Sequence, residues 1–204
     1  DDDTSTDDDT AQPGNFALAF SSPPAGWGSA PQTEALVLAE RFTIEFWFRR
    51  TGQMQGYVLD ARPPGSPSGY NWGIYTEGAD PGLTFFCNTG EGNEFFRGPN
   101  PNALNTEWHH FAVSRYAGEF LIYLDGGEVL ATEGEPCVVF AAPLLLGMYH
   151  VGPVPSLQNA EIDEVRISAE ARYYGTFTPE HVLLPDVYTT LLWHFDEGVG
   201  DVAT

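Results

Sequence analysis

The stretch FTIEFWFRRTG, residues 42–52, decides the fold class because apolar and polar side chains alternate along it. The apolar positions are Phe42, Ile44, Phe46 and Phe48. In an extended strand every second side chain points to the same face, so one face here is wholly apolar and the other is mixed. A strand with one apolar face covers the core of a β-sandwich. The stretch therefore predicts an all-β protein.

The same alternation returns further along the chain on both sides of short turns. Phe111–Val113 and Phe120–Leu124 flank the connection Tyr116–Gly118, which predicts a hairpin. The next turn is Asp125–Gly127, whose Asp-Gly step supplies the positive φ that a tight hairpin needs. A further strand is expected at Glu128–Thr132.

Short strands separated by turn residues are expected along the rest of the chain, which contains 22 Gly and 16 Pro. This regular spacing predicts one antiparallel two-sheet jelly roll over residues 15–204, without an internal domain boundary. One helical turn is expected at Ala169–Arg172. The remaining expected strands are Phe16–Phe20, Tyr57–Asp60, Asn71–Thr76, Leu83–Cys87, Val138–Phe140, Pro143–Gly147, Glu161–Ser168 and Thr190–Phe195.

The composition excludes several classes of function. With 204 residues, 42% of them hydrophobic, the chain can bury one core. Acidic residues outnumber basic ones 29 to 8 and give a net charge of −21, which disfavours nucleic acid and anionic membranes as partners. Lysine is absent, so lysine-dependent chemistry is excluded. The longest apolar stretch, Val138–Tyr149, is too short to span a bilayer and is interrupted by Pro143.

Residues 1–14 form an acidic arm that begins DDDTSTDDDT and carries six aspartates. One interpretation is a solvated spacer, because adjacent like charges repel one another. The alternative is an arm that collects calcium, because closely spaced carboxylates can share a hard cation. The candidate ligands in the arm are Asp1, Asp2, Asp3, Asp7, Asp8 and Asp9.

Five segments together resemble the laminin G-like jelly roll of the concanavalin A-like lectin and glucanase superfold. They are FALAF (residues 16–20), FTIEFWFRRTG (42–52), NTEWHHFAVSRYAGEFLIYLDGGEV (105–129), PLLLGMY (143–149) and AEIDEVRISAEARYYGTFTPE (160–180). The closing TTLLWHFDEGVGD, residues 189–201, fits bacterial members. The resemblance implies a secreted or cell-surface module that binds glycan, protein or calcium and lacks catalysis. It does not identify the ligand.

The resemblance also allows a test for glucanase activity, since jelly-roll glucanases carry ExDxxE on a strand. Glu161 and Asp163 match that pattern, but Arg166 stands where the general acid/base is required. Arginine stays protonated and cannot deliver a proton to a leaving group. In a regular strand Glu164 would point to the opposite face, so it is a poor substitute. The segment fits a structural strand with a local bulge better, and no enzymatic activity and no organic cofactor are expected.

Cation ligands outside the arm are expected in two acidic turns. Asp196, Glu197 and Asp201 cluster near the end of the sequence, and Asp125 lies in a hairpin turn. Carboxylate oxygens suit calcium. For each carboxylate alone, the simpler interpretation is a solvated surface group.

Aromatic residues near Gly/Pro-rich turns are candidates for stacking on sugar rings, with filling of the sandwich edge as the alternative. These residues are Trp27, Tyr70, Trp72 and Tyr149. The histidines at 109, 110 and 194 are interpreted as locally hydrogen-bonded strand residues.

The two cysteines, Cys87 and Cys137, suggest one disulfide, because a single pair in an acidic, secreted-looking chain is typical of an oxidising compartment. Two buried thiols are the alternative interpretation.

Two functional hypotheses follow. The first is an extracellular recognition or adhesion module that binds a glycan or a surface protein with the help of calcium. The second is a subunit of an extracellular fibre that binds copies of itself head to tail, because jelly rolls expose edge strands that an extended arm can join.

Overall fold

The computed structural model describes residues 17–21, 28–30, 38–62, 71–76, 82–149 and 156–196. In these ranges the chain forms strands and one short 3₁₀ turn, and it contains no helix long and apolar enough to cross a membrane. The elements are β1 (Leu18–Phe20), β2 (Gly28–Ala30), β3 (Phe42–Asp60), β4 (Trp72–Thr76), β5 (Thr84–Asn88), β6 (Asn93–Arg97), η2 (Pro101–Ala103), β7 (His109–Tyr116), β8 (Glu119–Leu124), β9 (Gly127–Glu133), β10 (Leu144–Leu146), β11 (Gln158–Ser168) and β12 (Thr189–Trp193).

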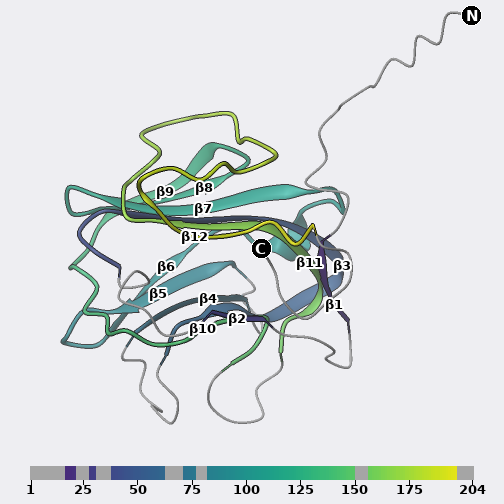
Figure 1. Cartoon of the computed structure of the whole chain (residues 1–204), viewed down its shortest axis with the longest axis horizontal. Coiled ribbons are helices and arrows are strands. Elements are labelled where there is room, and N and C mark those ends of the chain that lie inside the picture. The colour runs from purple at the N-terminus through teal and green to yellow at the C-terminus, as the bar shows by residue number, and fades with distance from the viewer. Residues whose placement is uncertain are drawn as a thin grey trace, which may run out of the picture.

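The strands form two packed antiparallel layers, which are joined because β3 takes part in both (Figure 1). In the upper sheet, the first half of β3 lies between β11 and β7, followed by β8 and β9, while β1 and β12 pair with the far edge of β11. In the lower sheet, the second half of β3 lies between β10 and β4, with β2, β5 and β6 outside them. The predicted all-β jelly-roll class is therefore confirmed.

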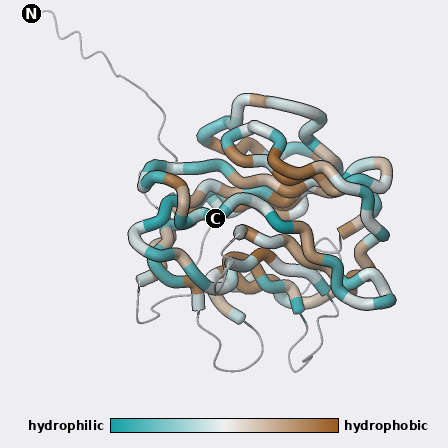
Figure 2. The backbone as a smooth tube through the Cα atoms, turned by 180° about the vertical axis from the view of Figure 1, so that it is seen from behind, coloured by the Kyte–Doolittle hydropathy of each residue, from teal (hydrophilic) through white to brown (hydrophobic). Residues whose placement is uncertain are grey.

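The core lies between the two sheets and is built from their inward-facing side chains. Phe42, Ile44, Phe46 and Phe48 of β3 are each at most 1% exposed, as their alternation predicts. Aromatic rings bridge the layers: Phe96 of the lower sheet stacks on Phe120 of the upper sheet, with ring centroids 3.9 Å apart. Hydrophobic stretches lie along the strands of both layers (Figure 2).

The outer face of the upper sheet is also buried, because the connection between β11 and β12, residues 169–188, lies over it (Figure 1). Tyr173 and Phe177 of this connection pack on a second, smaller apolar cluster. On the sheet side this cluster comprises Ala112, Leu121 and Tyr123. The mixed face of β3 is therefore buried like the apolar one, which explains why its polar members need specific partners.

Two local expectations are wrong. The helical turn expected at Ala169–Arg172 is absent, because side chains take the backbone N–H groups that a helix would use: Arg172 N–H donates to Thr43 Oγ1 at 2.9 Å. The strand expected at Val138–Phe140 is irregular backbone, since Val138 N–H donates to Asn88 O at 2.6 Å but no ladder follows.

Cys87 and Cys137 form a disulfide with their Cα atoms 5.5 Å apart. The bond joins β5 of the lower sheet to the irregular segment that precedes β10. The acidic arm and the boundary expected at residue 15 lie outside the described residues.

Candidate functional site

Strand β11 carries the residues that resemble a glucanase strand, and the structure gives each of them a different partner. Glu161 accepts a hydrogen bond from Arg49 Nε at 2.6 Å, so its carboxylate is neutralised on β3. Arg166 is buried, and its Nε donates to Glu45 Oε1 at 2.8 Å. A retaining hydrolase needs two free carboxylates about 5 Å apart. This strand therefore lacks the required acid/base pair.

The expected bulge in β11 is present. Its register against β3 shifts between Asp163 and Arg166, and Glu164 within the bulge has φ +51°. A left-handed conformation is costly for a residue with a Cβ and commonly marks a functional or strained position. The bulge interrupts the regular alternation of the strand, so simple periodicity does not predict where the Glu164 side chain lies.

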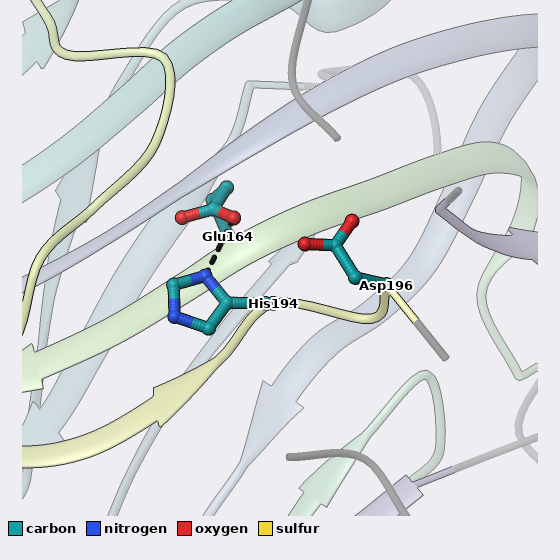
Figure 3. Close-up of side chains that lie close together, drawn as sticks. All are labelled: Glu164, His194 and Asp196. Carbon is teal, nitrogen blue, oxygen red and sulfur yellow. Dashed lines mark hydrogen bonds and ion pairs between the residues drawn. The ribbon is translucent and has the colours of Figure 1, made fainter. Parts of the chain in front are cut away.

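Glu164, His194 and Asp196 lie together at the β11–β12 end of the upper sheet (Figure 3). The carboxylate of Glu164 is fully buried, and its Oε1 lies 2.7 Å from His194 Nδ1. Its Oε2 accepts a hydrogen bond from Leu183 N–H at 2.6 Å. One donor atom from each of the three residues lies within 4.8 Å of the other two. This mixed nitrogen and oxygen set suits a divalent metal ion.

Asp163, next to Glu164, adds a second buried carboxylate. Its Oδ1 accepts a hydrogen bond from Glu164 N–H at 2.9 Å, whereas its Oδ2 has no hydrogen-bond partner among the described residues. Burial, together with the negative charges of Glu164 and Asp196, raises the pKa of Asp163 to about 8, although the hydrogen bond from Glu164 N–H lowers it. The region thus brings a buried carboxyl group with one unpartnered oxygen next to the cluster of Glu164, His194 and Asp196.

Among the cation ligands expected from sequence, only Asp196 and Asp125 lie in the described residues. Asp196 joins the cluster with Glu164 and His194. Asp125 instead fixes a hairpin turn: its Oδ1 accepts from His110 N–H, and its Oδ2 lies 2.8 Å from His109 Nδ1. Both oxygens of Asp125 therefore have protein partners. The other candidates, Asp1, Asp2, Asp3, Asp7, Asp8, Asp9, Glu197 and Asp201, lie outside the described residues.

The aromatic candidates divide in the same way. Trp72 is fully buried in the core on the inner face of β4, so the expectation that it stacks on a sugar ring is wrong. Tyr149 is half-buried and stacks on Tyr57, with ring centroids 4.7 Å apart. Trp27 and Tyr70 lie outside the described residues.

Tyr149 belongs to a tyrosine cluster on the outer face of the lower sheet, which also contains Tyr57 and Tyr75. Tyr57 and Tyr75 are cross-strand neighbours on β3 and β4, and their ring centroids lie 5.2 Å apart. The guanidinium of Arg62 lies 4.2 Å from the Tyr149 centroid and 4.8 Å from that of Tyr57. Asp60 holds this guanidinium through two hydrogen bonds of 2.7 and 3.0 Å. The three tyrosines are partly exposed around a fixed, locally neutral ion pair.

The histidine interpretations hold for positions 109 and 110. His109 Nε2 lies 2.9 Å from Asn105 Oδ1, and buried His110 contacts Glu45 through Nε2 at 3.1 Å. For His194 the local interpretation missed the cluster with Glu164. The available signal was the sequence His194-Phe195-Asp196, which places an imidazole and a carboxylate only two residues apart.

Comparisons with known proteins agree with the fold. A laminin G family model, described as the concanavalin A-like lectin/glucanases superfamily, matches residues 25–173. No curated protein matches the chain.

Solved structures with the same fold share little sequence with the chain. A structure of botulinum neurotoxin type C, described as depending on two ganglioside molecules for cell entry, has a TM-score of 0.57 at 17% identity. The matched region covers 76% of this chain and 39% of the toxin chain. Domains LG4-5 of the mouse laminin α1 chain have a TM-score of 0.56 at 16% identity, and the match covers 83% of this chain and 47% of the laminin chain. A heptameric pentraxin from Limulus polyphemus has a TM-score of 0.52 at 13% identity, and the match covers 77% of this chain and 76% of the pentraxin chain. The chain thus spans less than half of the first two proteins.

Proposed function

This chain belongs to the concanavalin A-like lectin/glucanases superfamily, and we propose that it is a non-catalytic extracellular module that binds a glycan. The observation that carries the proposal is the tyrosine cluster of Tyr57, Tyr75 and Tyr149 on the outer face of the lower sheet. The similar proteins include a toxin described as interacting with gangliosides, which agrees with a binding role but is a property of that toxin.

The chemistry of the tyrosine cluster suits a sugar. One face of a pyranose ring carries C–H groups and its rim carries hydroxyls, so a complementary surface needs apolar rings and polar atoms together. Tyrosine supplies both, and it loses little conformational freedom on binding. Because Arg62 is neutralised by Asp60, the cluster offers no free positive charge, and we propose a neutral glycan in preference to an anionic one.

The absence of hydrolysis is part of the proposal. The carboxylate of Glu161 is paired with Arg49, and Arg166 occupies the position that would need a proton donor. Incubation with mixed-linkage and β-1,3-glucans should release no reducing ends. Release of reducing ends by the purified chain would overturn this part of the proposal.

A glycan array followed by calorimetric titration of the strongest hit tests the binding surface. Tyr149→Ala should weaken binding at least tenfold, because it removes a ring that contacts both Tyr57 and Arg62. Tyr188→Ala is the matched control, since Tyr188 is also exposed but lies on the connection over the upper sheet. Equal losses in the two variants would reject the tyrosine cluster. An array without hits, together with capture of a cell-surface protein, would reject a glycan ligand.

A fibre subunit is the second candidate, favoured by the ends of the sheets. Among the described strands, β6 and β9 end the order of paired strands, and Phe95 on β6 is 59% exposed. Such an edge can accept a strand from another copy. We propose calcium between the arm aspartates and acids of the next copy as the link. Light scattering and negative-stain imaging with calcium and then with chelator test this, and a monomer in both conditions rejects it.

A further inference from the structure

The cluster of Glu164, His194 and Asp196 lies on the upper sheet and is separate from the tyrosine cluster of the lower sheet. Its three residues come from two segments that are distant in sequence but joined by the pairing of β11 with β12. Backbone distortion occurs on both segments: Glu164 has φ +51° and Phe195, between the other two residues, has φ +59°. Both segments thus leave regular strand geometry where the three side chains meet.

The distance between Glu164 and His194 suits a shared metal ion. Oε1 and Nδ1 lie 2.7 Å apart, joined by a hydrogen bond. Two ligands each about 2.1 Å from one ion, at an angle of 90° to 110°, are roughly 3.0–3.4 Å apart. An ion could therefore replace the bridging proton with a shift of a few tenths of an ångström. Leu183 N–H would continue to hold the other oxygen of Glu164, as outer partners of metal ligands commonly do.

Asp163 gives an independent reason to expect a cation here. Its side chain is 0% exposed, and one of its oxygens has no hydrogen-bond partner among the described residues. A buried polar oxygen without a hydrogen-bond partner is costly. Its other oxygen accepts a hydrogen bond from Glu164 N–H at 2.9 Å, which places the side chain next to the cluster. A divalent ion at the cluster would offset the cost of this unpartnered buried oxygen.

We propose that Glu164, His194 and Asp196 bind a divalent ion of the zinc class, with the buried side chain of Asp163 beside them. The imidazole nitrogen decides the class of metal. Calcium and magnesium take oxygen ligands, whereas imidazole together with carboxylates suits zinc. Because Asp196 is exposed and His194 is 28% exposed, the ion can enter from solvent. Three protein ligands leave one tetrahedral position open for water or a ligand oxygen.

A plain structural ion pair between Glu164 and His194 is the competing explanation. It accounts for the 2.7 Å contact, but it leaves both Asp196 and the unpartnered oxygen of Asp163 without a role. The two explanations differ in one measurable property, which is metal affinity that depends on His194.

Calorimetric titration of the full chain with zinc chloride and separately with calcium chloride tests the proposal. The wild type should show one tight zinc site, and His194→Gln and Asp196→Asn should each weaken it more than tenfold, beyond any weak binding by the acidic arm. Glu107→Gln is the matched control, because Glu107 is exposed and this substitution removes the same amount of charge as Asp196→Asn. Cobalt(II) substitution should give intense visible absorption bands that are lost in His194→Gln.

Each possible outcome is decisive. Zinc binding that is equal in His194→Gln and Glu107→Gln would assign the metal to the arm and overturn the site. Tight calcium binding with no zinc preference would overturn the assigned metal class. Asp196 is exposed, so Asp196→Asn leaves the core unchanged, and loss of zinc binding in this variant would support the site even if His194→Gln failed to fold.

Discussion

Glu45 is the residue whose surroundings show how the outer face of the upper sheet is held together. Its carboxylate is fully buried and contacts three groups: His110 Nε2 at 3.1 Å, Arg166 Nε at 2.8 Å and Tyr173 OH at 2.6 Å. Tyr173 belongs to the connection that covers the sheet, so a single carboxylate links two neighbouring strands to their cover. A buried charge network of this kind specifies one arrangement because every partner has a fixed place.

Replacing Glu45 with glutamine should strongly destabilise the fold. The substitution keeps the shape of the side chain but leaves the buried guanidinium of Arg166 without its counter-charge, which costs about 3–5 kcal/mol. Urea unfolding at pH 7 measures the loss. Glu107→Gln, at an exposed position, should change stability by less than about 0.5 kcal/mol. A Glu45→Gln midpoint equal to that of the control would contradict the role given to the network.

The same network predicts how the difference in the free energy of unfolding between wild type and Glu45→Gln changes with pH. Burial alone would raise the pKa of Glu45, but the hydrogen bonds and charges of His110, Arg166 and Tyr173 hold it below the ordinary 4.5. A lowered pKa in the folded state contributes stability above the unfolded value, and that contribution is lost as the pH falls through the folded value. The difference in the free energy of unfolding between the two proteins should therefore narrow as the pH falls below about 4.5.

At the scale of the elements, the turn between β8 and β9 anchors the connection over the upper sheet. Asp125 has φ +50° and Gly126 φ +76°, the pair of positive values that the Asp-Gly sequence predicts for a tight hairpin. Gly126 O accepts a hydrogen bond from Phe177 N–H at 3.0 Å. The turn thus supports the cover as well as joining two strands.

Alanine at Gly126 should therefore cost more than alanine at another positive-φ glycine. A Cβ at Gly126 would lie 1.8 Å from Phe177 O, so the connection would have to move. Gly118 is the matched control: it has φ +90° but nothing within 4 Å of the added Cβ. We expect Gly118→Ala to cost about 1 kcal/mol from backbone strain, and Gly126→Ala clearly more. Thermal unfolding measures the stability of both variants. Equal losses of stability would show that the close approach of Gly126 to Phe177 does not affect stability.

At the scale of the whole molecule, the parts that were predictable from sequence are those that depend on local periodicity. The alternation from Phe42 to Phe48 predicts a strand whatever that strand packs against, and the Asp125-Gly126 step predicts a turn. For Trp72, its place near a Gly/Pro-rich turn leaves both stacking on a sugar and filling of the sandwich open. Trp72 with Ile74 and Gly73 with Tyr75 are both pairs of alternate residues, and only the packed sheets determine which pair faces inward. Glu164 with His194 requires a bulge and a pairing of strands 30 residues apart, which local pattern does not encode.

The Cys87–Cys137 bond is the constraint that acts on the molecule as a whole, because it closes a loop with a sequence separation of 50 residues. Cross-linking a loop of this size should stabilise the fold by roughly 2–4 kcal/mol, largely by restricting the unfolded chain. Cys87→Ala, Cys137→Ala and the double variant should then lose similar amounts of stability in urea, since each of them removes the same bond. The two sites lie in different environments, one buried in β5 and one half-buried, so independent thiols would give unequal losses that add in the double variant. Additive losses, together with no two-hydrogen mass increase on reduction, would reject the bond.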